Sequence, residues 1–500
     1  KSPVEEGFER WRRRLGLMGG PLAMLGVYLW AGGLPAGERR LAAVLALVIV
    51  FWVTEAIPIP ATALLGPALC GLLGVAEARS VFGPFADPII FVFLGSFLLA
   101  RAMAVNGLDR RVALGVLGAG FIRGSPGRIR LAVGATALVL SMWISNTATV
   151  AILFPILLGI SGALERLFAQ GGAGARAGRS YFTGLMLMTA FAASIGGLAT
   201  PVGTPPNLIG LGMLEKLTGA RIPFFQWMLL GLPISLVMFA LLALLLRWLH
   251  PAPKQRLEGL GATVAELRKE VPAWGRAQSY TLAAFLTAVV LWVTPGLVAL
   301  ARGTEDPLYQ LLHTRLHEGV AALLGASLLF LLPVSWKQPR GALAWREAVR
   351  IDWGTILLFG GGLSLGSLMH SSGLAERLAR TLLEEGGQPS VWTITAAAAV
   401  ISTLITETTS NTASATMVVP VAIAVAQAAG VSPVLPALAA TLAASMAFTL
   451  PVSTPPNAIV YGSGRVSLLQ MLRAGVLLDL LGLGVILLLL WGLLPLLGLF

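Results

Sequence analysis

Apolar segments of about 20 residues follow one another along most of this chain. They lie near residues 18–34, 41–58, 60–78, 88–105, 225–249, 278–300, 315–333, 353–370 and 471–495. Segments of this length match the hydrocarbon thickness of a bilayer. Hydrophobic residues make up 56% of the 500 positions and charged residues 12%, whereas soluble domains carry about 25% charged residues. The pattern predicts an all-α polytopic membrane protein.

Two further apolar stretches are interrupted by polar residues. Residues 131–164 contain the phrase Ser-Asn-Thr-Ala-Thr at 145–149, and residues 392–426 contain Ser-Asn-Thr-Ala-Ser at 410–414. Non-helical backbone at membrane depth survives only beside protein or a polar cavity. We therefore expect two re-entrant helix–loop–helix hairpins.

A second pair of phrases follows the hairpins in the same order. Pro-Val-Gly-Thr-Pro-Pro-Asn occupies residues 201–207, and Pro-Val-Ser-Thr-Pro-Pro-Asn occupies residues 451–457. Because proline removes a backbone donor and ends helices, residues 180–212 and 434–461 read as broken helices. Two phrases repeated in order indicate an internal duplication.

Counting these elements gives about eleven spans and divides the chain. We expect an interfacial helix at residues 1–17, a first repeat at 18–249, a polar cytoplasmic linker at 250–277 and a second repeat at 278–500. Five spans separate the two hairpins, so the hairpins enter from opposite faces and the repeats are inverted. The distribution of Lys and Arg favours a cytoplasmic N-terminus, and we expect a bacterial inner (plasma) membrane location.

Composition argues against several other classes of function. The 35 basic residues punctuate the apolar segments rather than gathering in one domain, so we expect no nucleic-acid partner. The single cysteine, Cys70, excludes an intramolecular disulfide and a cysteine-based metal site. The sequence has no P-loop and no Gly-x-Ser-x-Gly motif. We expect no enzymatic activity and no organic cofactor.

The repeated phrases carry groups suited to anions and small cations. Helix N-termini at a hairpin tip attract anions, whereas carbonyl, hydroxyl and amide oxygens suit sodium. A further hydroxyl precedes each tip by one turn, Ser141 before Ser145 and Thr406 before Ser410. No Lys or Arg lies in the phrases, so helix termini and co-bound cations would neutralise an anion. Glu407, beside the second tip, is either a paired structural carboxylate or a proton- or substrate-sensing group.

These motifs resemble the divalent anion/sodium symporter family, whose members carry dicarboxylates, citrate or sulfate. Two flanking phrases, Trp52–Pro58 and Thr406–Thr412, are also similar to that family. The resemblance implies a homodimer in the lipid bilayer, with a scaffold domain and an elevator-type transport domain.

The resemblance also implies ligand sets, residue by residue. The first sodium site would use Ser141, Ser145, Asn146 and Gly203, and the second would use Thr406, Ser410, Asn411 and Ser453. The anionic substrate would contact Asn146, Thr147, Thr204, Asn411, Thr412 and Thr454. We expect sodium-coupled import of C4-dicarboxylates such as succinate, malate or fumarate by alternating access. Alternatives are a sodium-independent dicarboxylate exchanger, a sulfate or citrate transporter of the same fold, and an anion channel.

Overall fold

The protein is all-helical in its computed structural model. The structure describes residues 3–498, apart from 119–124, 169–172, 254–264, 267, 270, 272, 338–339 and 387–388. Helices account for nearly all regular structure in this part of the chain, which contains no β-strand. Half of the predicted linker at 250–277 lies outside the described residues.

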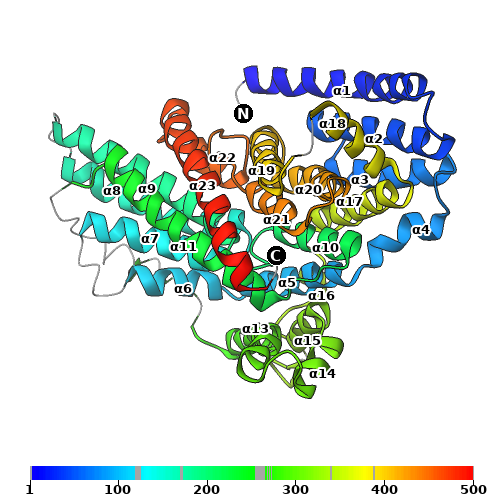
Figure 1. Ribbon diagram of the computed structural model, residues 1–500. Helices are drawn as coiled ribbons and strands as arrows, with labels where there is room; N and C mark the ends of the chain where they lie inside the picture. The colour runs from blue at the N-terminus through cyan, green and yellow to red at the C-terminus, as the bar shows by residue number, and fades with distance from the viewer. Residues whose placement is uncertain are drawn as a thin grey trace.

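The first half of the chain ends with a long helix before this linker. Its elements are α1 (Pro3–Trp30), α2 (Ala36–Thr54), α3 (Ile59–Leu72), α4 (Ala78–Phe82), the 3₁₀ turn η1 (Gly83–Ala86), α5 (Pro88–Val105), α6 (Leu108–Leu117), α7 (Pro126–Ser141), α8 (Asn146–Phe168), α9 (Ala173–Gly197), α10 (Pro205–Thr218) and α11 (Phe224–Leu249). In Figure 1, α7, α8, α9 and α11 lie together on the left of the view.

The second half begins with three helices that form a separate group at the bottom of Figure 1. Its elements are α13 (Arg276–Arg302), α14 (Pro307–Arg315), α15 (Glu318–Leu331), α16 (Trp345–Ala348), α17 (Trp353–Ser371), α18 (Leu374–Gly386), α19 (Val391–Thr408), α20 (Asn411–Ala428), α21 (Val434–Ala443), α22 (Pro455–Gly462) and α23 (Leu468–Leu496). The group of α13, α14 and α15 packs against α5 and α11.

The first helix differs from the expectation of an interfacial helix ending at residue 17. α1 continues without a break to Trp30 and packs lengthwise on α2. Small residues permit this contact, because a Cβ added at Gly20 would lie 2.3 Å from the Phe51 ring and one at Gly16 would lie 2.0 Å from Thr54. The boundary at residue 17 is therefore a change in polarity within one helix.

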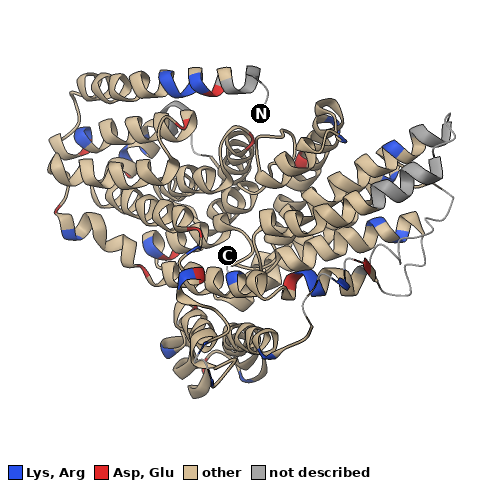
Figure 2. Cartoon of the chain, turned by 180° about the vertical axis from the view of Figure 1, so that it is seen from behind, with Lys and Arg blue, Asp and Glu red and all other residues tan. Residues whose placement is uncertain are grey.

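Six described helices are individually long and apolar enough to cross a membrane, and a seventh crossing arises if the bent pair α14 and α15 counts as one. Other predicted crossings fall on shorter apolar helices such as α3 and α21. Fewer helices reach this length than the eleven predicted spans, because several of the apolar segments are interrupted helices. Figure 2 shows that acidic and basic residues concentrate near helix ends, with long uncharged helices between them.

Helices of the two halves pack against each other at the centre of the molecule. α10, from the first half, packs against α20 and α21, and α22, from the second half, packs against α8 and α9. The contact between α10 and α21 is close, because a Cβ added at Gly210 would lie 1.9 Å from the Thr441 hydroxyl. Each broken helix thus lies beside the hairpin of the other half.

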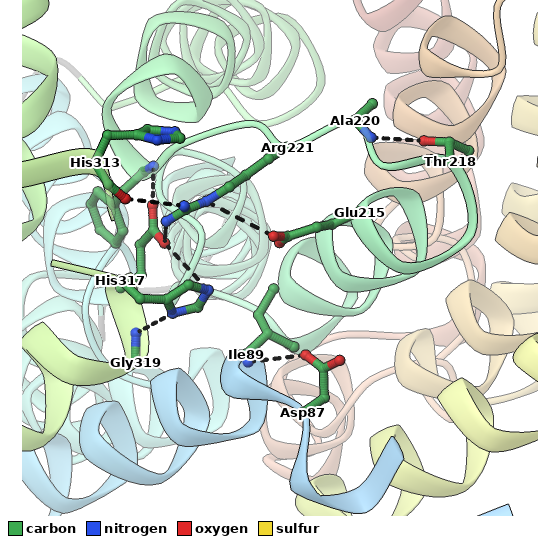
Figure 3. Close-up of polar contacts among 11 residues, drawn as sticks. Asp87, Ile89, Glu215, Thr218, Ala220, Arg221, His313, His317 and Gly319 are labelled. Atoms are coloured by element: carbon green, nitrogen blue, oxygen red, sulfur yellow. Dashed lines mark hydrogen bonds and ion pairs between the residues drawn. The ribbon is translucent and has the colours of Figure 1, made fainter. Parts of the chain in front are cut away.

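An ion-pair cluster joins this central region to the lower group of helices (Figure 3). Arg221, in the turn between α10 and α11, pairs with Glu318 at 2.6 Å. Glu318 also accepts a bond from the Phe224 N–H at the start of α11. His317 caps α15 by accepting from the Gly319 N–H at 3.1 Å. These contacts hold the start of α11 against the joint between α14 and α15.

Candidate functional site

A cavity of about 520 Å³ with both polar and apolar lining residues lies where the two hairpins and the two broken helices meet. Residues of both Ser-Asn-Thr tips line it, as do residues of both Thr-Pro-Pro phrases. Ten of the twelve predicted site residues line this cavity: Ser145, Asn146, Thr147, Gly203, Thr204, Ser410, Asn411, Thr412, Ser453 and Thr454. The fold therefore brings together phrases that are far apart in the sequence.

Four helices begin at the cavity wall. α8 starts at Asn146 and α20 at Asn411, whereas α10 starts at Pro205 and α22 at Pro455. The first turns of α8 and α20 leave backbone N–H groups without intrahelical partners, whereas α10 and α22 each begin with two prolines that have no N–H. Each N-terminus carries a partial positive charge of about half an electron. Their convergence brings partial positive charge to the cavity wall beside the two tips, which carry no Lys or Arg.

The other two predicted residues, Ser141 and Thr406, lie behind the tips and are fully buried. The Ser141 hydroxyl donates to Asn146 Oδ1 at 2.6 Å, and the Thr406 hydroxyl lies 2.8 Å from Asn411 Oδ1. Both tip asparagines are thus oriented by a hydroxyl five residues earlier. The i, i+4 spacing predicted a shared face with the serine, and the contact reaches the asparagine one position further on.

The Thr-Pro-Pro-Asn phrases close their loops in the same way. Asn207 Nδ2 donates to the Gly197 and Thr200 carbonyls at 2.9 and 2.8 Å. Asn457 Nδ2 donates to the Ala447 and Leu450 carbonyls, both at 3.0 Å. Both asparagines are fully buried. Sequence reasoning missed this role, although the position of the asparagine after two prolines was visible as part of each phrase.

Charged residues that sequence reasoning missed also line the cavity. Arg101 of α5 and Arg350, just before α17, both lie on its wall, and Glu347 is 2.5 Å from Arg101 and 3.5 Å from Arg350. Asp352 also faces the cavity and caps α17. Arginines beside apolar segments are typical markers of membrane topology, so their sequence positions did not indicate a place on the cavity wall. The ion pair between Arg101 and Glu347 joins residues that are 246 positions apart, and the hydrophobic pattern of the sequence did not indicate it.

Glu407 connects the second hairpin to the second broken helix. Its carboxylate accepts bonds from the Thr449 N–H at 2.9 Å, the Leu450 N–H at 3.1 Å and the Ser453 hydroxyl at 2.6 Å. Of the two readings of Glu407, these contacts favour the paired, structural one. The same contacts place the carboxylate against a residue predicted to bind sodium.

Comparison with known proteins places the chain in a family. The model for the sodium:sulfate symporter transmembrane region matches residues 21–498. A Staphylococcus saprophyticus protein named sodium-dependent dicarboxylate transporter SdcS is 35% identical over 450 residues, covering 89% of this chain and 84% of its own. The Staphylococcus aureus protein of the same name is 33% identical over 501 residues, covering 99% and 93%.

Two solved structures share the fold at lower sequence identity. The Alcanivorax borkumensis YdaH transporter has a TM-score of 0.51 at 17% identity, covering 82% of this chain and 84% of its own. Neisseria gonorrhoeae MtrF has a TM-score of 0.56 at 11% identity, covering 92% and 96%. Together with the family match, this fold shows that the chain is a membrane transporter belonging to the sodium:sulfate symporter family.

Proposed function

We propose that this transporter couples the import of C4-dicarboxylates to sodium by alternating access. The observation that carries the proposal is the single cavity at which four helix N-termini and two oriented asparagine tips converge. The names of the Staphylococcus relatives support both the dicarboxylate and the sodium dependence.

Substrate and sodium would share the two tip asparagines. Each Oδ1 already faces a hydroxyl donor, and an amide oxygen has a second lone pair for a cation. Each amide nitrogen supplies two donors for a carboxylate. We assign the substrate to Asn146, Thr147, Thr204, Asn411, Thr412 and Thr454. Because the same side chain serves both ligands, each ligand orders the site for the other, which is a coupling free energy.

The proposed cation sites lie beside these contacts. The first consists of Ser141, Ser145, Asn146 and Gly203, and the second of Thr406, Ser410, Asn411 and Ser453. The buried positions of Ser141 and Thr406 support a ligand lodged between hairpin and broken helix. Sodium is a co-substrate in this proposal, and its positive charge offsets the negative charge of the dianion.

We further propose a homodimer in which the hairpins and broken helices move together against a scaffold. The exchanged packing of α10 on α20 and of α22 on α8 supports movement as one unit, since neither half can slide alone.

The membrane orientation is tested with single introduced cysteines. Cys70 is the chain's single cysteine and is buried, so background labelling is low. With a cytoplasmic N-terminus in the bacterial plasma membrane, Glu305→Cys reacts with an impermeant maleimide in intact cells. Lys269→Cys reacts only after permeabilisation. The reverse pattern would invert the orientation.

The function is tested by uptake of radiolabelled succinate into proteoliposomes, with and without an inward sodium gradient. We expect saturable uptake that requires sodium. Sodium-independent uptake that requires internal dicarboxylate would replace symport with exchange. Current without saturation would indicate a channel.

A second candidate substrate class is sulfate or citrate. The description of the matching family favours sulfate, because it names a sodium:sulfate symporter. Each anion is added in excess during succinate uptake. Stronger inhibition by sulfate than by unlabelled succinate, together with sodium-driven uptake of sulfate itself, would favour this candidate.

A further inference from the structure

The two halves of the molecule make matching contacts around the broken helices. A Cβ added at Gly231 would lie 2.4 Å from the Leu198 carbonyl, and one at Gly475 would lie 2.3 Å from the Phe448 carbonyl. The paired contacts of Ser141 with Asn146 and of Thr406 with Asn411 align the hairpins. In this alignment Met142 corresponds to Glu407, and four residues beyond the paired glycines Ser235 corresponds to Asp479.

The first half holds its broken helix without a carboxylate. The Thr200 hydroxyl donates to the Met142 carbonyl, and the Ser235 hydroxyl donates to the Ile195 carbonyl at 3.0 Å. The N–H groups of Leu198 and Ala199 bond to carbonyls within the same turn. This break is therefore closed by neutral groups.

The second half holds its broken helix with two acids. Glu407 accepts the Thr449 and Leu450 N–H groups and the Ser453 hydroxyl. Asp479 of α23, which is 7% exposed, accepts the Thr449 hydroxyl at 2.7 Å. Within the described part of the chain, neither acid forms an ion pair with Lys or Arg.

Glu407 is partly buried and Asp479 is buried. A carboxylate withdrawn from water without a basic partner is costly unless other groups compensate it. Bonds from backbone N–H groups compensate part of the charge, and a bound cation would compensate more. Glu407 follows Thr406 directly and bonds Ser453, so it contacts both ends of the proposed second cation site. Donation of the Ser453 hydrogen to Glu407 turns the remaining lone pairs of that hydroxyl away from the carboxylate.

We infer that Glu407 is a positioning residue that makes the second cation site the stronger of the two. It orders the loop that carries Ser453 and adds negative charge beside the site, whereas Met142 does neither at the first site. This inference rests on the proposed sodium coupling.

The test compares Glu407→Gln with Met142→Gln, which changes the matching position of the first half. Succinate uptake by proteoliposomes is measured against external sodium. Loss of charge-assisted bonds is expected to raise the sodium concentration for half-maximal uptake roughly five- to tenfold in Glu407→Gln. Met142→Gln is expected to leave it unchanged. The KM for succinate at saturating sodium is expected to stay near wild type in both.

A structural role alone would lower stability without changing sodium dependence. The melting temperature of each purified variant is therefore recorded in potassium and in sodium, without substrate. We expect the sodium-induced rise to shrink in Glu407→Gln and to persist in Met142→Gln. If Glu407→Gln does not fold, Glu407→Asp replaces it, because this variant keeps the charge and withdraws the carboxylate from Thr449, Leu450 and Ser453. Its shift is expected in the same direction and smaller.

Two outcomes overturn the inference and differ from each other. A sodium-dependent wild type with unchanged sodium curves in Glu407→Gln, or with equal shifts in both variants, would refute the positioning role alone. A wild type that transports without sodium would refute the proposed coupling, and this inference with it.

Discussion

The two broken helices present the same polar phrase to one cavity but are closed by different means. In the first, α9 continues to Gly197 and the break spans residues 198–204, whereas in the second α21 ends at Ala443 and the break spans 444–454. The short break depends on two glycines in contact, since a Cβ at Gly203 would lie 2.5 Å from the Gly197 carbonyl. The long break has Ala447 and Ser453 at these places and relies on Glu407.

The cavity-lining residues of the two breaks are alike, whereas the groups that support their backbone differ. The threonines that precede α10 and α22 have nearly identical backbone angles, with φ and ψ of −145° and 143° at Thr204 and of −139° and 149° at Thr454. The groups behind them differ in size and charge. The duplicated halves thus keep the cavity lining alike while the supporting contacts diverge, so equivalent substitutions are expected to have unequal effects.

The largest expected effect comes from giving the first break the residue of the second. Gly203→Ser places a side chain against the Gly197 carbonyl and Cα, at 2.5 and 2.9 Å for the Cβ. Overpacking against backbone costs about 1–3 kcal/mol or more. It also displaces the adjacent Thr204, which we assign to the substrate. We expect sodium-driven uptake to be lost and the melting temperature to fall. Gly127→Ala, at a helix position with open space around it, is the control and is expected to match wild type.

Removing either tip asparagine is expected to weaken the binding of both sodium and succinate. Asn146→Ala and Asn411→Ala each delete an amide oxygen and nitrogen that face the cavity. Loss of hydrogen bonds to charged groups is expected to lower uptake roughly 30- to 100-fold at limiting sodium and succinate. Binding of each ligand is measured by calorimetry on purified protein. If Asn411→Ala kept wild-type sodium dependence and succinate affinity, the site assignment would be wrong.

The buried asparagines that close the loops allow a comparison of stability. Asn207→Ala removes the bonds to the Gly197 and Thr200 carbonyls, and Asn457→Ala removes those to the Ala447 and Leu450 carbonyls. Each loss is expected to cost about 2–3 kcal/mol of unfolding free energy. Because Glu407 still holds the second loop, Asn457→Ala is expected to have the smaller effect on melting temperature in detergent. An equal fall in both variants would contradict the role given to Glu407 in closing the break.

Sequence reasoning located the discontinuities because polar residues in apolar helices are conspicuous. It placed the breaks near residues 145 and 410, where α8 and α20 begin. It did not foresee the greater length of the second break, since that depends on a carboxylate 42 positions before the Thr449 N–H that it accepts. The continuous α1 was also missed, because its contact with α2 requires small residues whose partners lie in another helix.

The cavity wall shows a similar limit. The ten lining residues at the tips and phrases were predictable because they recur in both halves. Arg101 and Arg350 belong to no phrase that is repeated in the other half. They lie beside apolar segments, where basic residues ordinarily mark membrane topology. Only the packing of α5 near the segment before α17 brings both arginines to Glu347 and the cavity. A residue without a repeated phrase around it carries no local signal of its role.

The smallest expected effect concerns the hydroxyls behind the tips. The single hydrogen of Ser141 serves Asn146 Oδ1 at 2.6 Å. Thr406 has one hydrogen and two acceptors, Asn411 Oδ1 at 2.8 Å and the Ala444 carbonyl at 2.6 Å. Ser141→Ala therefore removes a full bond from its asparagine, whereas Thr406→Val removes a shared one. At about 1 kcal/mol for one neutral hydrogen bond, Ser141→Ala is expected to raise the half-maximal sodium concentration roughly fivefold.

Thr406→Val keeps the side-chain shape, and we expect its increase to be smaller than that of Ser141→Ala. Uptake against sodium in proteoliposomes measures both variants, with Thr406→Ser as the control that keeps the hydroxyl. A larger effect of Thr406→Val would mean that the Thr406 oxygen contributes more to sodium binding than the Ser141 oxygen does. In that case the second site would depend on its upstream hydroxyl mainly as a sodium ligand, and the first site mainly as the group that orients its asparagine.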